Sequence, residues 1–278
     1  MDSIKVMVNG LPGNVAVNLT RHILADDRFT AVPFSLTGPE ITAADHTIDT
    51  TRIQLIRPQD QDSAIAAIKA EYGDFISVDF THPSAVNPNA EFYCRQALPF
   101  VMGTTGGDRE HLAATVRSSS ISAVIAPNMA KQIVGFQAMM EYAATTFPGL
   151  FCDYSMTVRE SHQQGKADTS GTARAIIRNF NQLGIDFSEG DIQMERNPEI
   201  QRSAWKIPEE HIGGHGWHTY TLTSPDKTVC FEFTHNVNGR DIYALGTMDA
   251  INFLYQQVTA GSKGTVFTMI DVLRAGGN

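Results

Sequence analysis

The sequence has few cysteines and no long apolar run. Its three cysteines, Cys94, Cys152 and Cys230, are odd in number and far apart, which fits neither a zinc ribbon nor a disulfide framework. We therefore expect reduced residues of the core. No window approaches the ~18 consecutive apolar residues that a membrane-spanning helix needs. A strand pattern begins within the first ten residues, so we expect no signal or transit peptide. The expected location is the cytoplasm, or the plastid stroma if this is a processed plant protein.

The chain also has no excess of basic residues. The chain has 21 Lys and Arg against 30 Asp and Glu, a formal net charge of -9, and its basic residues are scattered. This composition argues against nucleic acid as a partner, and a small anionic ligand would need positive charge gathered locally. With 278 residues, of which 42% are hydrophobic, the chain is long enough for two domains with cores of their own.

The first half opens with a strand, a glycine turn and a helix. Residues 4–9 form a short apolar run, G-L-P-G-N-V-A follows at 10–16, and a helical pattern continues to Leu24. Glycines let the backbone approach a pyrophosphate, and the helix N-terminus offers it amides and a positive dipole end. The spacing is G-x-x-G-x-x-A and not G-x-G-x-x-G, so a plain structural turn remains an alternative at this point.

Strands and helices then alternate, which predicts a Rossmann-like, doubly wound parallel sheet in an α/β domain. The expected strands are 29–36, 75–80, 100–102 and 122–125, with helices at 62–71, before Gln96 and from Arg109. The later strands end in D-F-T-H-P, G-T-T-G-G and A-P-N-M. Ligands of such sheets bind at the carboxyl ends of the strands. Each loop taken singly is also compatible with an ordinary connection between strand and helix.

The acidic residue that usually binds the ribose of NAD is missing after the second expected strand. Ser35 and Thr37 stand there instead, which favours NADPH because a 2′-phosphate would be tolerated. Neither this segment nor the glycine turn supplies an evident Arg or Lys for that phosphate, so NADH remains possible.

The second half predicts an α+β domain with an open mixed sheet. A helix is expected at 133–146, a strand at 152–159, and a hairpin of strands 217–223 and 228–235 joined by S-P-D-K. The expected domains are 1–130 for the dinucleotide, 131–239 for the substrate and oligomerisation, and a tail at 240–278 that begins with a helix and returns to the first domain. His211, His215 and His218 have the spacing of metal ligands on one helix face, but three nearby glycines disfavour that helix. We therefore expect no metal.

One stretch, E-S-H-Q-Q-G-K-A-D-T-S-G-T-A at 160–173, gathers the chemistry of a site. His162 can hold or give a proton near neutral pH, and Lys166 can bind a carboxylate or act as an acid. A helix is expected after Gly171, and the N–H groups of Ser170, Gly171 and Thr172 at its start form an anion site. The combination suits a dicarboxylate substrate that must be protonated. The alternative is a polar loop that caps an ordinary helix.

The motifs resemble those of the 4-hydroxy-tetrahydrodipicolinate reductases of lysine biosynthesis, and the plant type more closely than the common bacterial type. The resemblance covers essentially the whole chain. It rests on V-N-G-x-x-G, D-F-T-x-P, G-T-T-G, A-P-N-M, E-S-H-Q-x-x-K-x-D-T-S-G-T-A, H-N-V-x-G-R and M-I-D-V-L-R. The bacterial type usually has a second histidine where Gln163 stands, and one residue more in the loop before the helix.

This resemblance implies an NAD(P)H-dependent oxidoreductase of the diaminopimelate pathway, which delivers hydride to C4 of a cyclic imine dicarboxylate. His162 and Lys166 would be the acid pair. The substrate would be bound by Lys166 together with Thr105, Gln163, Ser170, Gly171 and Thr172. The cofactor would be bound by Gly10, Leu11, Pro12, Gly13, Asn14, Val15, Ser35, Phe80, Gly103, Thr105, Pro127, Asn128, Met129, Arg240 and Tyr243. The resemblance also implies a homodimer or homotetramer.

Two departures and two alternatives stay open. Plant-type sequences usually have Lys where Asn14 stands and Met-Gly where Val15 and Ala16 stand, which leaves the cofactor preference in doubt. A paralogue that reduces another conjugated imine or enamine carboxylate would share the fold and the acid pair. A non-catalytic protein that binds nicotinamide nucleotides is the second alternative, although it would have no use for the acid pair of His162 and Lys166.

Overall fold

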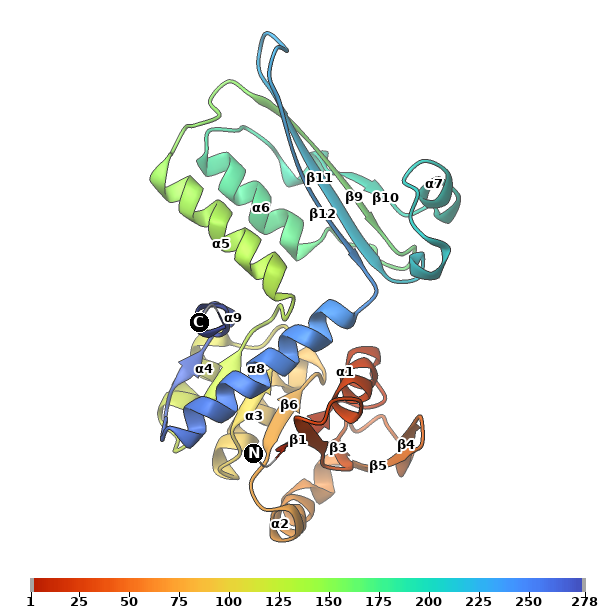
Figure 1. The fold of residues 1–278 in the computed structure, drawn as a ribbon, viewed down its shortest axis with the longest axis vertical. Helices are drawn as coiled ribbons and strands as arrows, with labels where there is room; N and C mark the ends of the chain where they lie inside the picture. Colours follow the sequence, from red (N-terminus) through yellow and green to blue (C-terminus); the bar gives the residue numbers. More distant parts are fainter. Residues whose placement is uncertain (1–2, 277–278) are drawn as a thin grey trace. The chain divides into compact units, whose positions relative to one another are not determined.

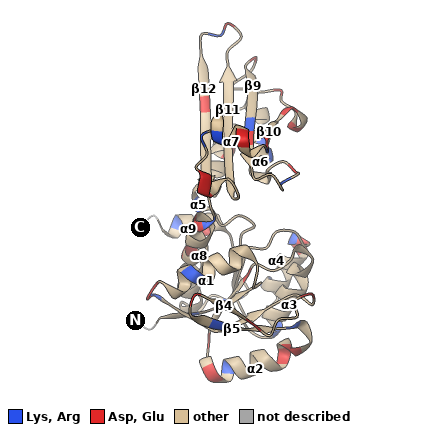
Figure 2. Ribbon diagram, turned by 90° about the vertical axis from the view of Figure 1, so that its right-hand side faces the viewer, with Lys and Arg blue, Asp and Glu red and all other residues tan. Residues whose placement is uncertain are grey.

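The computed structural model describes residues 3–276, and the chain forms two compact units. The first consists of Met1–Lys131 together with Asp241–Asn278, and the second is Gln132–Arg240. Figure 1 shows both units, and Figure 2 shows Lys, Arg, Asp and Glu dispersed over them. Within residues 3–276, no helix has both the length and the apolar character that a membrane span needs.

The first unit is built on a six-stranded sheet in the order β13-β8-β7-β6-β1-β2, and every pairing in it is parallel. This confirms the predicted Rossmann-like sheet. Its strands are β1 (Ile4–Asn9), β2 (Phe29–Ala31), β6 (Ile76–Asp79), β7 (Phe100–Met102), β8 (Ala123–Ile125) and β13 (Val266–Phe267). The helices of the unit are α1 (Asn14–Leu24), α2 (Gln61–Tyr72), α3 (Val86–Arg95), α4 (Arg109–Arg117), α8 (Asp241–Thr259) and α9 (Met269–Ala275).

Helices cover both faces of this sheet, which is why its strands are almost continuously apolar. Met7, Phe100 and Met102 pack with residues of α2, α3 and α4 in one buried cluster. On the other face α1 and α8 lie side by side, where Asn18 donates a hydrogen bond to Asp241 (2.9 Å). The carboxyl ends of β1, β6, β7 and β8 therefore stay open at one edge of the sheet, where their loops meet.

The expected strand 29–36 is wrong as a single element. Residues Phe29–Ala31 pair with β1, whereas β3 (Phe34–Leu36) belongs to a separate three-stranded sheet with β4 (Asp45–Ile48) and β5 (Thr51–Ile56), in the order β3-β5-β4. Pro33 lies at the break, and a proline has no N–H for a sheet ladder. The β4–β5 hairpin was not predicted, since its turn holds Asp49 at φ 52 and lacks the usual glycine.

The second unit is a mixed four-stranded sheet in the order β10-β9-β11-β12, as expected. Its strands are β9 (Ser155–His162), β10 (Gln193–Glu195), β11 (His215–Thr223) and β12 (Cys230–Asn238), and its helices are α5 (Lys131–Thr146), α6 (Gly171–Gln182) and α7 (Pro198–Ser203). The predicted β11–β12 hairpin is antiparallel. Residues of α5 and α6 pack on one face of the sheet in a single apolar cluster.

Two expectations for this unit need correction. β9 begins three residues later than predicted because Phe151, Cys152 and Asp153 form a turn, with Asp153 at φ 69. β9 also ends three residues later than predicted, so His162 is the last residue of a strand and not part of the loop. Cys152 and Cys230 are exposed and Cys94 is only partly buried, so the expectation of core cysteines is wrong for the first two.

Candidate active site

The glycine turn after β1 has the geometry that a close backbone approach requires. Gly10 has φ +103, and a Cβ there would overlap the carbonyl of Phe80, so only glycine fits. Gly13 is the N-cap of α1, and its N–H donates to the carbonyl of Gly10 (2.8 Å). The turn is thus fixed at both glycines of the predicted motif.

The start of α1 is open and uncharged. Pro12, Gly13 and Asn14 are exposed and Val15 is partly buried, while Leu11 lies in the core at 1% exposure. The first three N–H groups of a helix lack intrahelical acceptors and carry the positive end of its dipole. The residues at 10–15 therefore fit the phosphates of a dinucleotide.

Ser35 of β3 and Thr37, just after that strand, hold this turn in place. The Ser35 hydroxyl accepts the N–H of Leu11 (3.3 Å), and the Thr37 hydroxyl donates to the Leu11 carbonyl (2.9 Å). Ser35 is fully buried. The two hydroxyls expected at the ribose are thus used to position the backbone of the glycine turn.

Two charged residues that no sequence motif indicated lie beyond β3. The carboxylate of Glu40 lies against Gly38, and the Arg57 guanidinium donates to the carbonyl of Thr42 (2.7 Å). Both therefore lie at the loop where a dinucleotide's ribose is usually bound. Arg57 follows β5, a strand that was not predicted, so only the tertiary structure brings it to this loop.

Asp79 joins the loops that follow β6 and β7. It is fully buried, and its carboxylate accepts hydrogen bonds from the hydroxyls of Thr81 (2.8 Å), Thr104 (2.6 Å) and Tyr93 (2.7 Å). Burial and the negative charge of Asp79 hold the pKa of Tyr93 well above its ordinary value. The tyrosine therefore stays a donor to the carboxylate. The sequence offered D-F-T as a motif but no sign of this role for its aspartate.

The predicted cofactor residues of these loops come together. Phe80 follows β6, and a Cβ on Gly103 would overlap its ring just as one on Gly10 would overlap its carbonyl. Phe80 is therefore packed between the two glycines. Thr105 is exposed two residues beyond Gly103, at the same edge of the sheet.

The loop after β8 rests on α8. Pro127 is exposed, Asn128 accepts the N–H of Ala130 through its side chain (3.0 Å), and Met129 is buried. A Cβ on Gly246 of α8 would overlap the carbonyl oxygen of Met129. Tyr243 lies one turn before Gly246 on the same helix and is partly buried.

Arg240, the remaining predicted cofactor residue, belongs to the second unit. Its guanidinium lies near Gly214, since a Cβ on that glycine would be 3.3 Å from Nη1.

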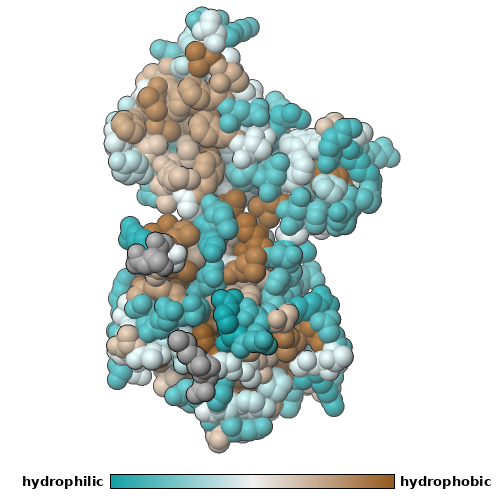
Figure 3. Space-filling view, in the orientation of Figure 1, coloured by the Kyte–Doolittle hydropathy of each residue, from teal (hydrophilic) through white to brown (hydrophobic). Residues whose placement is uncertain are grey.

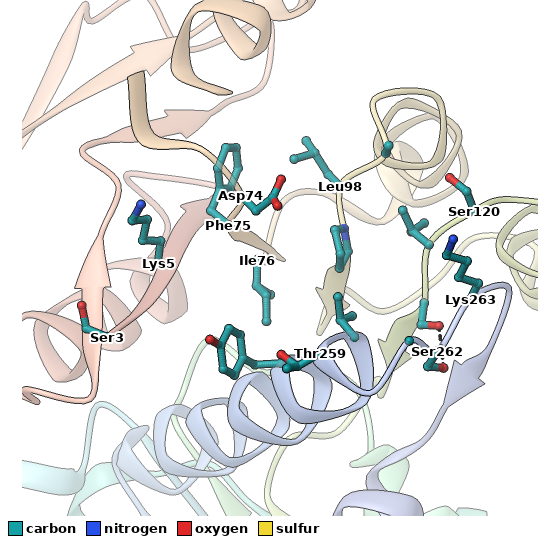
Figure 4. Close-up of a pocket in the computed structure, with 17 residues that line it drawn as sticks. Ser3, Lys5, Asp74, Phe75, Ile76, Leu98, Ser120, Thr259, Ser262 and Lys263 are labelled. Carbon is teal, nitrogen blue, oxygen red and sulfur yellow. Dashed lines mark hydrogen bonds between the residues drawn. The ribbon is translucent and has the colours of Figure 1, made fainter. Parts of the chain in front are cut away.

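A cavity of about 620 Å³ lies elsewhere in the first unit, at the amino ends of the strands. Its wall includes Lys5, Asp74, Ser120 and Lys263 (Figure 4). None of the predicted site residues lines it. The ligands of open parallel sheets bind at the opposite edge, so we do not assign the cofactor to this cavity.

In the second unit, the two-residue period of β9 decides which side chains share a face. Met156 and Val158 point into the apolar core, so Glu160 and His162 follow on the same face. Across the sheet, His218 pairs with Glu160 in the register of β11.

His235 of β12 pairs with His218 and extends this row, and its ring stacks on that of His218 with centroids 4.6 Å apart. We call Glu160, His162, His218 and His235 the histidine cluster.

His162 has a hydrogen-bond partner at each ring nitrogen. Its Nδ1 lies 3.0 Å from the carbonyl of His215, and its Nε2 lies 3.3 Å from Nε2 of His218. A carbonyl only accepts, so Nδ1 carries a proton. Burial lowers the pKa of His162 from 6.5 to about 4; the negative charge of Glu160 opposes this, and Arg196 and Lys166 add to it. His162 is therefore a neutral Nδ1–H imidazole at neutral pH.

Lys166 sits on a turn in the loop between β9 and α6. Its N–H donates to the carbonyl of Gln163 (3.0 Å), and its ammonium pairs with the exposed carboxylate of Asp168 (2.7 Å). The hydrogen bond from the Lys166 ammonium, together with its charge, holds the pKa of Asp168 below its ordinary value. The side chain of Lys166 is 23% exposed, so it can reach a ligand while its backbone is fixed.

Arg196, which follows β10, fixes that loop from the other side. Its guanidinium donates to the carboxylate of Glu160 (2.5 Å) and to the carbonyl of Lys166 (2.8 Å). Glu160 is fully buried and the Arg196 side chain is 18% exposed. The ion pair therefore joins β9 to the loop. Glu160 opens the predicted motif, but nothing in the sequence pointed to Arg196 as its partner.

The start of α6 differs from the expectation at one amide. The N–H of Ser170 donates to Glu160 (3.3 Å) and Ser170 is buried, so that group is already occupied. Gly171 and Thr172 are in the first turn, where the helix supplies no acceptors of its own. Gly171 is exposed, and a Cβ on it would meet nothing within 4 Å, so there is open space at the start of the helix.

His211, His215 and His218 have the spacing of metal ligands on a helix face, but His215 and His218 lie in strand β11 and not on a helix. Instead, Glu160, His162 and His218 offer ligand atoms within 4.8 Å of one another. Arg196 already pairs with Glu160, and the two imidazoles contact each other. We assign no metal to this group.

Comparison with known proteins covers both units. The family model "Dihydrodipicolinate reductase, N-terminus" matches residues 4–129, and "Dihydrodipicolinate reductase, C-terminus" matches residues 133–273. The chain is 44% identical to the probable 4-hydroxy-tetrahydrodipicolinate reductase 1, chloroplastic, of Oryza sativa subsp. japonica, over 99% of this chain and 80% of that protein. It is 45% identical to 4-hydroxy-tetrahydrodipicolinate reductase 2, chloroplastic, of Arabidopsis thaliana, over 99% and 78%.

A solved structure has the same fold. The dipicolinate-bound dihydrodipicolinate reductase from Paenisporosarcina sp. TG-14 superposes with a TM-score of 0.63 over 96% of this chain and 97% of that one, at 18% identity. The matches to both family models and to the plant relatives confirm the resemblance seen in the motifs. The chain belongs to the dihydrodipicolinate reductase family.

Proposed function

We propose that this protein reduces 4-hydroxy-tetrahydrodipicolinate to tetrahydrodipicolinate with a nicotinamide cofactor, as a step of lysine biosynthesis. Family membership supports the reaction class. The observation that carries the proposal is the loop between β9 and α6, where Lys166 follows the buried His162 in the chain and precedes the helix start at Gly171 and Thr172. Such a loop offers a carboxylate-binding site and a source of protons between residues 162 and 172.

The overall change balances with one cofactor. The substrate, NAD(P)H and a proton give tetrahydrodipicolinate, NAD(P)⁺ and water, the water arising from the 4-hydroxyl group. The cofactor supplies the hydride that reaches C4. The protein must bind the two carboxylates and deliver a proton to the enamine that develops as C4 is reduced.

Lys166 and His162 are proposed to have different roles in the transfer of that proton. Lys166 carries its ammonium on a partly exposed side chain, so we assign to it the contact with the substrate, as acid and carboxylate ligand. His162 is neutral and buried behind the loop. It acts with Lys166 by accepting or relaying a proton at Nε2, the nitrogen that does not face the carbonyl. In the second unit, the proposed substrate site also includes Gln163, Ser170, Gly171 and Thr172. Thr105, of the first unit, is proposed as a substrate ligand because the family resemblance implies it.

We assign the cofactor to the first unit. The open start of α1, the turn at Gly10 and the packing of Phe80 against Gly103 support this assignment. Asn128, Arg240 and Tyr243 are proposed to contribute as the family resemblance implies. Preference for NADPH is supported by the guanidinium of Arg57 at the loop after β3, because a 2′-phosphate is commonly bound by arginine. Glu40 at the same loop would favour NADH.

The second unit and the relatives also suggest the assembly and the compartment of the protein. Met139, Tyr142, Phe147 and Leu150, on α5 and just after it, are each more than half exposed, and Figure 3 shows an apolar area on this side of the second unit. Such an area is typical of an interface, so we propose a homodimer or homotetramer, which light scattering can test. Relatives named as chloroplastic support the plastid stroma over the cytoplasm.

The deciding experiment measures cofactor oxidation by the purified protein, with substrate formed freshly from pyruvate and aspartate semialdehyde. NADPH and NADH are compared in parallel, with Lys166→Ala and Asn14→Lys as matched variants. We expect Lys166→Ala to lower turnover by about 100-fold or more, since general acid catalysis contributes that much. Asn14→Lys lies at the exposed start of α1 and should change mainly the KM for the cofactor.

The outcomes separate the candidates. Rapid oxidation that Lys166→Ala abolishes supports the reductase. Equal and modest losses in the two variants would refute the role of Lys166. Tight NADPH binding without turnover would favour a paralogue with another imine substrate, or a protein that only binds the cofactor.

A further inference from the structure

His218 is a buried imidazole whose contacts the reaction scheme does not use. His218 is 3% exposed, and its ring packs against that of His162 with centroids 5.0 Å apart and an interplanar angle of 71°. Its Nε2 lies 3.3 Å from Nε2 of His162 and 3.7 Å from the carboxylate of Glu160. A polar ring in this position costs free energy unless its hydrogen bonds are made.

The proton positions in this pair follow from the partners. His162 carries its proton on Nδ1, because Nδ1 faces the carbonyl of His215. Neutral His162 therefore has a bare lone pair on Nε2, and the contact with His218 is a hydrogen bond only if His218 donates. Among residues 3–276, Nδ1 of His218 has no hydrogen-bond partner. That agrees with a ring whose single proton is on Nε2.

We propose that His218 is a positioning residue for the reduction, whose Nε2–H fixes the tautomer and the orientation of His162 by donating to its Nε2. This inference rests on the proposed function, since it gives His162 a part in proton transfer. The pair holds His162 with its accepting nitrogen fixed in place before substrate arrives. When His162 takes up a proton on Nε2, the contact survives only if the proton of His218 moves to Nδ1.

The charged and titratable neighbours of the pair come from every strand around it. Glu160 belongs to β9, Arg196 follows β10, His235 belongs to β12, and Lys166 lies on the loop. Burial holds the pKa of His218 well below its ordinary value, and the positive neighbours add to this. His218 is therefore neutral, and its removal takes away a hydrogen-bond donor without removing a charge.

Loss of that donor has a definite effect on His162. A hydrogen bond donated to Nε2 stabilises the neutral imidazole, so its removal raises the pKa of His162. The ring would also be free to turn about its remaining bond to the backbone. We therefore expect a change in kcat and in the acidic limb of the pH profile, with little change in KM, because the groups assigned to the carboxylates are elsewhere.

The test compares His218→Leu with His218→Gln in the full-length protein. Glutamine can place an N–H near the position of Nε2, whereas leucine keeps the volume without a donor. We expect His218→Leu to lower kcat about 10- to 100-fold, with KM changed less than about twofold, and to move the acidic limb to higher pH. His218→Gln should restore most of the activity and the profile. Leu222→Val, a buried change four residues along the same strand, is the matched control and should leave both unchanged.

A second measurement needs no turnover. Nitrogen-15 spectra of histidine-labelled protein distinguish the two neutral tautomers, and we expect Nδ1–H for His162 and Nε2–H for His218. The Nε2–H tautomer at His162 would overturn the proposal even if the enzyme is active. So would a normal kcat and pH profile in His218→Leu, or a folded His218→Gln as inactive as the leucine variant. If the wild type lacks turnover, the proposed function fails while the tautomers still test the hydrogen bond.

Discussion

The ion pair between Glu160 and Arg196 should be among the most sensitive contacts of the second unit. The carboxylate is fully buried and the guanidinium side chain is 18% exposed. Breaking a buried pair by removing one partner costs about 3 to 5 kcal/mol, because the other charge stays behind uncompensated. In Glu160→Gln, Arg196 keeps its bond to the Lys166 carbonyl, so we expect the lower end, about 3 kcal/mol.

The pair can be measured directly with a double-mutant cycle. Arg196→Met leaves a buried carboxylate whose remaining partner is the N–H of Ser170, and we expect about 4 kcal/mol of destabilisation. The double variant leaves no charge unpaired, so it should be destabilised by less than the sum of the two. We expect a coupling of about 2 kcal/mol, within the range found for contacting residues.

Tryptophan fluorescence during urea unfolding is the assay. The two tryptophans of the chain, Trp205 and Trp217, both lie in the second unit, so the signal reports the unfolding of that unit. Glu209→Gln is the matched control, because its pair with Arg202 is exposed and solvent screens such a pair strongly. If the single effects of Glu160→Gln and Arg196→Met add to within about 0.5 kcal/mol, the pair does not hold the loop as described.

Two further predictions concern stability. Gly246→Ala should destabilise the first unit by about 1 to 3 kcal/mol, because the new Cβ overlaps the Met129 carbonyl. This is the opposite of the usual effect, since alanine in a helix is normally about 1 kcal/mol more stable than glycine. Thermal melts show the sign of the stability change, with Leu245→Ala, at an exposed neighbour, as control. Acid should weaken the second unit: the pKa of His162 is about 4 when folded and 6.5 as its ordinary value, so the unfolded chain binds the proton first. This stability is present above pH 6.5 and is lost as pH falls toward 4. His162 alone accounts for a loss of about 2 kcal/mol between pH 7.5 and 5; urea unfolding should show it, and an equally steep loss in His162→Asn would contradict it.

Local patterns were enough for much of the fold. Alternating strands and helices predicted the parallel sheet, and the alternation of 217–223 and 228–235 predicted the β11–β12 hairpin. Both follow from short-range rules, namely the period of the side chains and the right-handed crossover between parallel strands. Where the rules compete locally the prediction failed: Pro33 divided a run that reads as one strand, and Asp49 closed a hairpin without a glycine.

The sequence indicated only some of the residues of the site. His162 and Lys166 stand out because their chemistry is unusual and they are four residues apart. Asp79 and Glu160 did not stand out, although each lies inside a quoted motif, because an acidic residue in a motif gives no sign of being fully buried. The partners of a buried charge are set by strand pairing and not by sequence distance.

Residue patterns along the chain were enough to predict the classes of structure and the chemical groups: a glycine turn that fits a dinucleotide, a mixed second domain, and an imidazole and an ammonium ahead of a helix start. Which of these groups are already engaged depends on how the chain packs. It places His218 opposite Glu160 from 58 residues away, brings Arg196 onto the loop of Lys166, and commits Ser35 and the Ser170 amide to contacts within the protein. The physical reason is that hydrogen bonds and ion pairs in a buried site depend on distances of a few ångströms between strands, and the register that sets those distances is a property of the packed sheet.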